Sequence, residues 1–206
     1  MGTLLTFEPP APRLRAAVLE RCGVDVGETA AGRAIRDEIA YYRAHLHEGG
    51  DAAGLAALRL ASAEAMRPAL ALDVPGAVLT ELLLAALRFH ALPGVPDALR
   101  ELCALGLRLV VVSNWDVSLH ERLAETGLSE LLDGAVASAE AGVAKPDPAI
   151  FARGLELAGV GPQEALHVGD SLVEDGEGAR AAGIRAVIIG RDISSLAQLR
   201  SYSSLG

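Results

Sequence analysis

The apolar pattern of this chain changes at residues 93–96, Pro-Gly-Val-Pro, and the change separates two fold classes. Before it, apolar side chains recur every three or four residues, as in helices; Ile35, Ile39 and Tyr42 form one such series. After it, residues 107–112 form a continuous apolar run rich in β-branched side chains, which is typical of a buried parallel strand. The chain must therefore build a helical part and an α/β part.

Helix-like and strand-like segments alternate through the second part. We expect helices over residues 96–105, 117–126, 148–158 and 172–182, and strands over residues 107–112, 135–138, 165–168 and 186–189. Such alternation builds a Rossmann-like α/β core, a parallel sheet with helices on both faces. Leu4 and Leu5 are predicted to end one further strand of this sheet, most of which is missing from the chain.

The first part is predicted to be an inserted bundle of about four helices. Breaks at residues 23–27, 49–50 and 73–76 separate them, with loop lengths that are usual in bundles. We assign residues 11–91 to this helical cap, and residues 1–10 together with 92–206 to the α/β core. A chain of 206 residues is long enough to bury a core in both parts.

Composition and charge exclude several classes of partner. The net charge of −9 and the absence of a Lys/Arg run argue against nucleic acid, whose phosphates an acidic surface repels. Cys22 and Cys103 lie too far apart in sequence to suggest a disulfide framework or a zinc site. The longest apolar stretch, residues 77–92, is shorter than the roughly 20 residues that span a bilayer, and no secretory signal opens the chain. We therefore expect a cytoplasmic protein with no membrane contact.

Three acidic residues follow the strand over residues 165–168 within six positions: Asp170, Glu174 and Asp175. Two carboxylates about 4 Å apart repel by on the order of 4 kcal/mol at an effective dielectric constant of 20, and Mg²⁺ relieves such repulsion through hard oxygen ligands. The alternative is helix capping, since Ser171 and Glu174 form a capping-box pattern. Capping does not require Asp170, so we favour a metal site there.

Lys145 lies just before a strong helix start, in which Asp147 is the N-cap and Pro148 the first helical residue. That start does not need Lys145. A lysine at this place adds a cation where a helix N-terminus already favours anions, although an isolated lysine is more often a plain surface residue.

Ser113 and Asn114 end the strand over residues 107–112 and can offer a hydroxyl and a backbone amide to an anion. The alternative is that Asn114 or Asp116 caps the following helix. His167 is predicted to pack in or near the core instead of taking part in catalysis.

These polar residues all follow predicted strands. Because ligands of open α/β sheets bind outside the carboxyl ends of the strands, we expect the three loops to converge on one site. At this point the chain resembles the haloacid dehalogenase-like (HAD) hydrolase superfamily, in particular members with a small helical cap after the first strand. The resemblance covers essentially the whole chain and is carried by residues 2–4 (Gly-Thr-Leu), Ser113, Lys145, and Asp170 with Asp175.

The resemblance implies a reaction and a set of roles. In that family an aspartate attacks a phosphoryl group, forms an aspartyl-phosphate, and water then releases phosphate. Carried over, Ser113 and the Asn114 amide hold the phosphoryl oxygens, and Lys145 balances the charge of nucleophile and substrate.

The resemblance also implies a magnesium site. Asp170 binds Mg²⁺, while Asp175 supports either the water shell of the metal or Lys145. Thr3 steadies the first loop.

The first motif departs from the family pattern Asp-x-Asp-Gly-Thr. Met1 stands at the second aspartate, and the nucleophile falls two residues before Met1, which implies a chain truncated through this motif. The resulting interpretation is a Mg²⁺-dependent phosphatase of a small phosphorylated metabolite. The alternatives are a 2-haloacid dehalogenase-like hydrolase and a non-catalytic protein that binds phosphorylated ligands or a partner. Neither the metabolite nor the oligomeric state follows from the sequence.

Overall fold

The chain divides into two compact units in the structure, a computed structural model that describes the backbone of residues 2–201 and the side chains of residues 2–199. Residues 1–6 and 91–206 form one unit, called here the α/β unit, and residues 7–90 form the helical unit. The predicted boundaries, after residues 10 and 91, lie four residues and one residue later than these. Met1, on which the first motif depends, lies outside the described residues.

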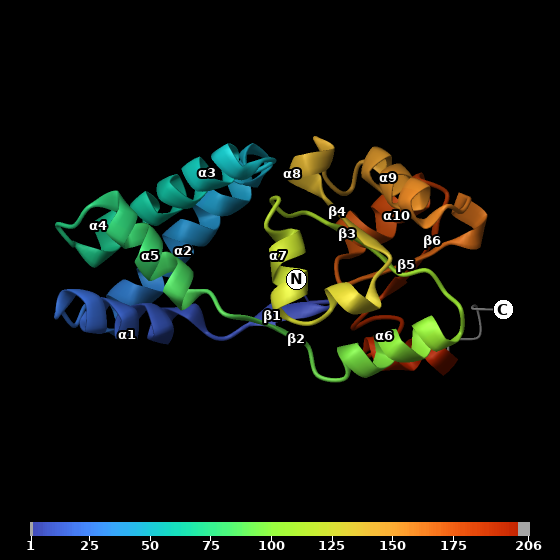
Figure 1. Ribbon diagram of the computed structural model, residues 1–206, viewed down its shortest axis with the longest axis horizontal. Coiled ribbons are helices and arrows are strands. Elements are labelled where there is room, and N and C mark those ends of the chain that lie inside the picture. The colour runs from blue at the N-terminus through green and yellow to red at the C-terminus, as the bar shows by residue number, and fades with distance from the viewer. Residues whose placement is uncertain (1, 202–206) are drawn as a thin grey trace. The chain divides into compact units, whose positions relative to one another are not determined.

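The helical unit is a bundle of helices around an apolar core (Figure 1). Its elements are α1 (Pro10–Cys22), α2 (Gly27–His45), η1 (Leu46–Glu48), α3 (Ala52–Ala65), α4 (Arg67–Leu70) and α5 (Gly76–Ala86). Helix α1 packs against α2 and α5, and α3 packs against the same two helices. Leu14, Met66 and Leu79 are among the fully buried side chains between them.

The α/β unit follows the predicted order of elements. Its strands are β3 (Val110–Ser113), β4 (Gly134–Ala137), β5 (Leu166–Gly169) and β6 (Arg185–Ile188); its helices are α6 (Val95–Ala104), α7 (Leu119–Glu125), η2 (Ser129–Leu131), α8 (Ser138–Ala141), α9 (Pro148–Ala158), η3 (Pro162–Glu164), η4 (Leu172–Glu177), α10 (Gly178–Ala181) and η5 (Leu196–Ser201). The predicted start of α9 is confirmed, because the Asp147 carboxylate accepts a hydrogen bond from the Ala149 amide (2.9 Å) and Pro148 follows directly.

The strands pair in parallel, as predicted, but in two separate pairs. Strand β3 pairs with β4, with Val110 opposite Gly134, and β5 pairs with β6, with Leu166 opposite Arg185. Helix α9 packs on β3 and β4, α10 packs on β6, and α6 packs on η5. The fold class is therefore α/β with a Rossmann-like parallel core and an inserted helical bundle, and the sheet has two halves.

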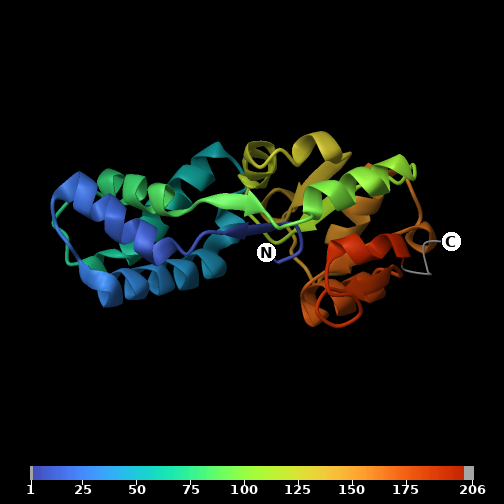
Figure 2. The same ribbon diagram turned by 90° about the horizontal axis from the view of Figure 1, so that it is seen from below.

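The prediction that Leu4 and Leu5 end a strand of the parallel sheet is wrong. Leu5 begins β1 (Leu5–Phe7), which pairs with β2 (Phe89–Ala91) instead of β3 or β5. The amide of Leu92 donates to the Leu4 carbonyl (2.9 Å) and that of Glu8 to the Arg88 carbonyl (3.1 Å), so the two strands are antiparallel. They carry the chain into and out of the helical unit, side by side (Figure 2).

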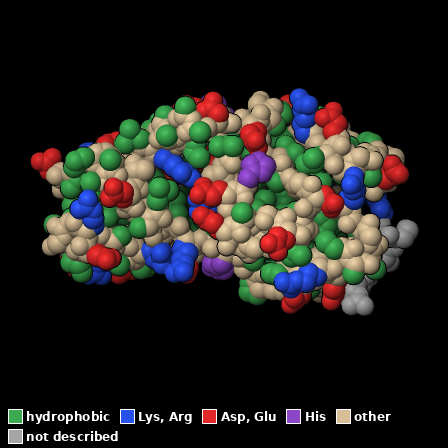
Figure 3. All heavy atoms as spheres, viewed as in Figure 1, with side chains coloured by type: hydrophobic (Ala, Val, Ile, Leu, Met, Phe, Trp, Pro, Cys, Tyr) green, Lys and Arg blue, Asp and Glu red, His purple; other side chains and the backbone are tan. Residues whose placement is uncertain are grey.

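Positive and negative side chains are interspersed on the face seen in Figure 3, and the positive ones form no continuous band there. Among the described residues, no helix is both long enough and apolar enough to cross a bilayer.

Candidate active site

A cavity of about 580 Å³ in the α/β unit brings the predicted site residues together. Thr3, Ser113, Lys145, Asp170 and Asp175 all line it. They come from the N-terminal turn and from loops at the carboxyl ends of β3, β4 and β5, as expected for a parallel α/β sheet. Asn114, the sixth predicted residue, is bonded to the backbone of Lys145.

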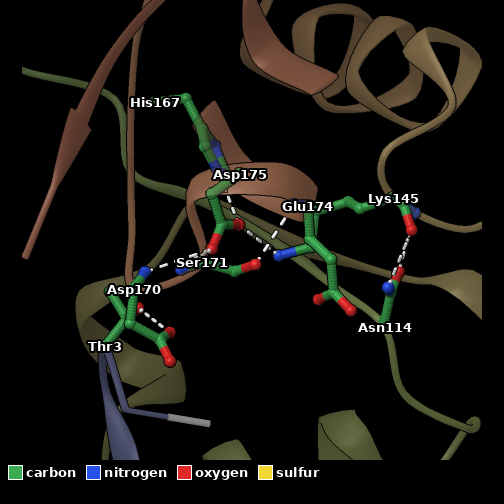
Figure 4. A network of polar contacts seen from close by, with 8 residues as sticks. All are labelled: Thr3, Asn114, Lys145, His167, Asp170, Ser171, Glu174 and Asp175. Carbon is green, nitrogen blue, oxygen red and sulfur yellow. Dashed lines mark hydrogen bonds and ion pairs between the residues drawn. The ribbon is translucent and has the colours of Figure 1, made fainter. Parts of the chain in front are cut away.

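The Asp175 carboxylate is the centre of the polar network at this cavity (Figure 4). Its Oδ1 accepts from Lys145 Nζ (2.6 Å) and from His167 Nε2 (2.9 Å). Its Oδ2 accepts from the backbone amides of Asp170 (3.1 Å) and Ser171 (2.9 Å). A carboxylate has about four lone-pair positions, so these four donors fill it.

Asp175 is held in its charged form by these donors. Its side chain is only 4% exposed, and burial by itself raises the pKa of such a carboxyl. The hydrogen bond from His167 and the charge of Lys145 outweigh that effect and keep the pKa of Asp175 well below its ordinary value. With its acceptor positions occupied, Asp175 is placed to hold Lys145, one of the two roles that the resemblance implies for it.

The turn around Asp175 has an unusual helical register. The amide of Gly176 donates to the Ser171 carbonyl (3.1 Å), five residues back, and η4 is a π-helix. Ser171 caps it by accepting from the Glu174 amide (3.1 Å), as the capping-box pattern predicts. The reciprocal bond, to the Ser171 amide, is made by Asp175 in place of Glu174, because the wider turn brings the next residue around.

Gly169 makes room for this arrangement. A Cβ at residue 169 would overlap the Asp175 carboxyl group, so the strand can end beneath that carboxylate only if the residue lacks a side chain.

Lys145 is fixed at its backbone as well as at its ammonium group. Asn114 Nδ2 donates to the Lys145 carbonyl (3.0 Å), and the Lys145 amide donates to Asn114 Oδ1 (2.7 Å). The Asn114 side chain therefore fastens the loop after β4 to the end of β3, and the turn before α7 is made by Asp116, whose Oδ1 accepts from the Ser118 amide (2.7 Å). The alternative that Asn114 or Asp116 caps the following helix is wrong, because the N-cap of α7 is Ser118.

Asp170 differs from Asp175 in being exposed. Its Oδ1 accepts a hydrogen bond from Thr3 Oγ1 (2.8 Å), which ties the N-terminal turn to the end of β5. Gly2 lies against the same carboxylate with a φ of +120°, a conformation and a contact that both favour glycine.

The donor set at Asp170 suits magnesium. Mg²⁺ prefers oxygen ligands and commonly binds through one or two carboxylates, keeping several waters. Asp170 offers such a carboxylate at the cavity. Over the described residues no group of three His, Cys, Asp or Glu side chains gathers as a ready-made cage. The metal assignment of Asp170 thus stays a prediction, and it does not depend on a cage.

His167 is a site residue that the sequence analysis assigned to the core. Its side chain is 14% exposed and meets the Phe151 ring edge-on, with ring centroids 5.0 Å apart. Its Nε2 nevertheless contacts Asp175, so it also serves the polar network. The sequence signal that could have identified His167 as a site residue was its position near the end of β5, close to the acidic residues that follow.

Comparisons with known proteins identify similar hydrolases. Residues 2–183 match the family of haloacid dehalogenase-like hydrolases. The chain is 43% identical over 101 residues to human haloacid dehalogenase-like hydrolase domain-containing protein 3, covering 49% of this chain and 40% of that protein. It is 37% identical over 107 residues to a phosphoserine phosphatase of Thermus thermophilus, covering 52% of this chain and 43% of that enzyme. The matches thus span less than half of these relatives' length.

Among solved structures, an HAD phosphatase from Thermococcus onnurineus aligns with a TM-score of 0.65 at 25% identity. That alignment covers 99% of this chain and 94% of the other. It extends over both units, whereas the relatives above match about half of the chain. Because the family match extends over most of the sequence, this chain belongs to the haloacid dehalogenase-like hydrolases.

Proposed function

We propose that this chain carries the phosphate-binding and metal-binding parts of a Mg²⁺-dependent phosphatase that acts on a small phosphorylated metabolite. The observation that carries the proposal is a single cavity lined by the Ser113 hydroxyl, the Lys145 ammonium group and the exposed Asp170 carboxylate. The phosphoserine phosphatase activity named for the Thermus relative supports a phosphate ester as substrate.

The phosphoryl group is held by donors at the ends of β3 and β4. Ser113 Oγ and the backbone amide of Asn114 donate to two of its oxygens. Lys145 has three N–H donors, of which one bonds Asp175, so two remain for a phosphoryl oxygen and the nucleophile. Asp175 holds the ammonium group in place through this ion pair.

Asp170 would hold Mg²⁺, with the hydrogen bond from Thr3 orienting its carboxylate. When bound, the metal neutralises charge on the phosphoryl group and so allows one anion to approach another. A dehalogenase has no comparable need for a cation, and Asp170 would then have no chemical role. The exposed Asp170 carboxylate, which has no ion-pair partner among the described residues, therefore favours the phosphatase over the dehalogenase.

The nucleophile in this proposal is an aspartate two residues before Met1. Its carboxylate oxygen bonds to phosphorus while the bond from phosphorus to the substrate oxygen breaks, and the departing alkoxide takes a proton from water. Water then attacks the aspartyl-phosphate, whose P–O bond breaks to release phosphate and a proton. The helical unit acts as the cap that selects the metabolite.

The test compares three forms of the chain: the 206 residues alone, and the same chain preceded by Asp-Ala or by Asn-Ala. Inorganic phosphate release from p-nitrophenyl phosphate, phosphoserine and a panel of sugar phosphates is measured with and without Mg²⁺, and halide release from 2-chloropropionate in parallel. We expect phosphate release from the Asp-Ala form alone, dependent on Mg²⁺. Lys145→Met in that form should lower kcat about 10²–10³-fold.

Two results would count against the proposal. Halide release without phosphate release would assign the chain to the dehalogenases. Saturable phosphate binding by a folded Asp-Ala form that turns over neither substrate would indicate a non-catalytic binding protein.

A further inference from the structure

Lys145 is the only lysine of the chain, and its side chain lines the cavity described above. Apart from the histidines, every other basic side chain is an arginine. A lysine side chain is a flexible four-carbon stem with about 2 kcal/mol of rotamer entropy, so its ammonium group stays in one place only if a partner holds it. That partner is Asp175, whose Oδ1 accepts from Lys145 Nζ across 2.6 Å. The place of the cation therefore depends on the place of one carboxylate oxygen.

The two oxygens of the Asp175 carboxylate are held by different kinds of donor. Oδ2 accepts from the amides of Asp170 and Ser171, which belong to the backbone. These amides anchor Oδ2 and leave the direction of Oδ1 to its own two donors, Lys145 Nζ and His167 Nε2 (2.9 Å; Figure 4). Of these two donors the imidazole is the stiffer, because a ring on one methylene group moves far less than a four-carbon stem. His167 is therefore the donor that can fix Oδ1 for Lys145.

Close packing around Phe151 holds the ring of His167 in turn. The two rings meet with their planes 87° apart. Phe151 is 1% exposed, and its Cε2 lies 2.8 Å from the position that a Cβ at Gly178 would take. Gly178 has an ordinary helical φ of −60°, so its lack of a side chain serves this packing and not the backbone conformation. The imidazole thus has a support that cannot easily shift.

We propose that His167 is a positioning residue for Lys145. Its Nε2–H directs Asp175 Oδ1 toward the ammonium group, and Oδ1 in turn holds that group where it meets an anion in the cavity. Because the ammonium group has three N–H donors and Oδ1 takes one, two remain for the anion. The inference rests on the proposed function only in taking that anion to be a phosphoryl group.

The main experiment follows the ammonium group itself by nuclear magnetic resonance. With ¹⁵N-labelled lysine the chain gives a single side-chain ammonium signal, since it has a single lysine. His167→Phe keeps an aromatic ring and removes the donor, so hydrogen exchange of the ammonium group with water should speed up roughly tenfold. His167→Gln places an N–H at a similar reach and should stay within about twofold of the parent. Exchange that is unchanged or slower in His167→Phe, or equally fast in both variants, contradicts the proposal.

The matched control is His120, which makes the same kind of contact elsewhere in the α/β unit. His120 Nε2 contacts Glu140 across 2.7 Å, and both side chains are exposed. His120→Phe and His120→Gln should leave the Lys145 signal unchanged. The melting temperature of all four variants is recorded as well. A His167→Phe variant that melts lower but keeps the ammonium exchange of the parent would show a merely structural role, and would overturn the proposal.

A second measurement is made on the unchanged chain. The charged Asp175 carboxylate only accepts hydrogen bonds, so the proposal requires a proton on His167 Nε2. Long-range ¹H–¹⁵N correlation of histidine-labelled protein shows which ring nitrogen carries the proton. A proton on Nε2, in the neutral or the charged ring, supports the proposal. A neutral ring with its proton on Nδ1 cannot donate to Asp175 and would overturn it.

Inorganic phosphate separates this inference from the proposed function. Titrated into the chain, phosphate should shift the Lys145 ammonium signal saturably. His167→Phe should weaken this binding about 10–100-fold, and His167→Gln should bind as the parent does. A parent that binds no phosphate would count against the proposed function, while the ammonium exchange rates still decide the role of His167. Equal phosphate affinity in the parent and both variants would overturn the inference and leave the proposed function standing.

Discussion

The α/β unit and the helical unit each contain a buried carboxyl group with a shifted pKa, and the two shifts have opposite directions. Asp175 in the α/β unit receives four hydrogen bonds, and its pKa lies well below the ordinary value. Glu38 on α2 of the helical unit is 5% exposed, and burial raises its pKa to about 7. The hydroxyl of Ser62 on α3 is also buried, with no hydrogen-bond partner among the described residues. Burial raises the pKa of both acids, and only Asp175 has the donors that outweigh this effect and keep it charged.

The two acids give the units opposite dependence on pH. Asp175 stabilises the folded α/β unit above the unfolded pKa of about 3.9, and that contribution is lost as the pH falls below it. Glu38 is neutral in the folded protein below about pH 7. Below the unfolded pKa of about 4.3 it is neutral in both states, so its raised pKa does not reduce the free energy of unfolding there. The helical unit loses stability as the pH rises through the folded pKa, about 7.

The largest expected effect comes from removing the charge of Asp175, the buried carboxylate whose hydrogen bonds are all made. Asp175→Asn leaves the ammonium group of Lys145, 10% exposed, without its counter-charge. Removing one partner of a buried pair costs about 3–5 kcal/mol. At about 2–4 °C per kcal/mol for a chain of this size, the melting temperature should fall by about 10 °C at pH 7. Differential scanning calorimetry measures it.

The matched control for that variant is Asp97→Asn. Asp97 pairs with Arg100 across 2.7 Å, but both side chains are exposed, and such pairs contribute little. Its melting temperature should stay within about 2 °C of the parent. An equal fall in melting temperature in the two variants would mean that the buried ion pair of Asp175 stabilises the protein no more than the exposed pair of Asp97.

The second prediction concerns Glu38, the buried acid with the raised pKa. The pKa shift of Glu38, from 4.5 to about 7, corresponds to about 3 kcal/mol of lost stability above pH 7. Glu38→Gln removes the ionisable group, so the helical unit should be more stable than the parent at pH 8 and similar at pH 4. Hydrogen exchange in α2 as a function of pH measures this.

Glu20→Gln, on the exposed face of α1, is the control and should leave the pH profile unchanged. A Glu38→Gln variant whose profile still declines between pH 5 and pH 8 would assign the decline to another group.

The smallest effect separates the charge of Lys145 from its position. Asn114→Ala removes two hydrogen bonds to the Lys145 backbone, at about 1 kcal/mol each. We expect a drop of about 5 °C in melting temperature, and faster exchange at the Lys145 amide. Gln163→Ala, which loses one exposed bond to the Gly183 carbonyl, should have almost no effect. If Asn114→Ala leaves the Lys145 amide protected, the ion pair alone holds the loop.

Local patterns predicted most of the α/β unit. The N-cap of α9 and the apolar run of β3 carry their signals within a few residues, and the structure has both elements near the predicted places. The gathering of Ser113, Lys145 and Asp170 at one cavity followed from their common place after strands, whereas Thr3 was expected there only from the family resemblance. Such inferences need only the period of the sequence and the geometry of parallel sheets.

The contacts that escaped prediction depend on register and on distant partners. The bond between His167 and Asp175 requires the π-turn of η4, and a capping-box pattern does not indicate that extra residue. Leu5 was assigned to the parallel sheet because an apolar pair fits any strand, and its actual partner lies more than 80 residues away in β2. The raised pKa of Glu38 likewise depends on its burial in the folded helical unit, which the sequence spacing does not reveal.

The antiparallel pairing of β1 and β2 has a consequence for protein engineering and for the evolution of the fold. The amide of Glu8 donates to the carbonyl of Arg88, so residues 9–87 leave and return at neighbouring points. Insertions with adjacent ends disturb their host little, since the host chain need not be rerouted. A different folded module could be inserted at the same two positions without rerouting the rest of the chain.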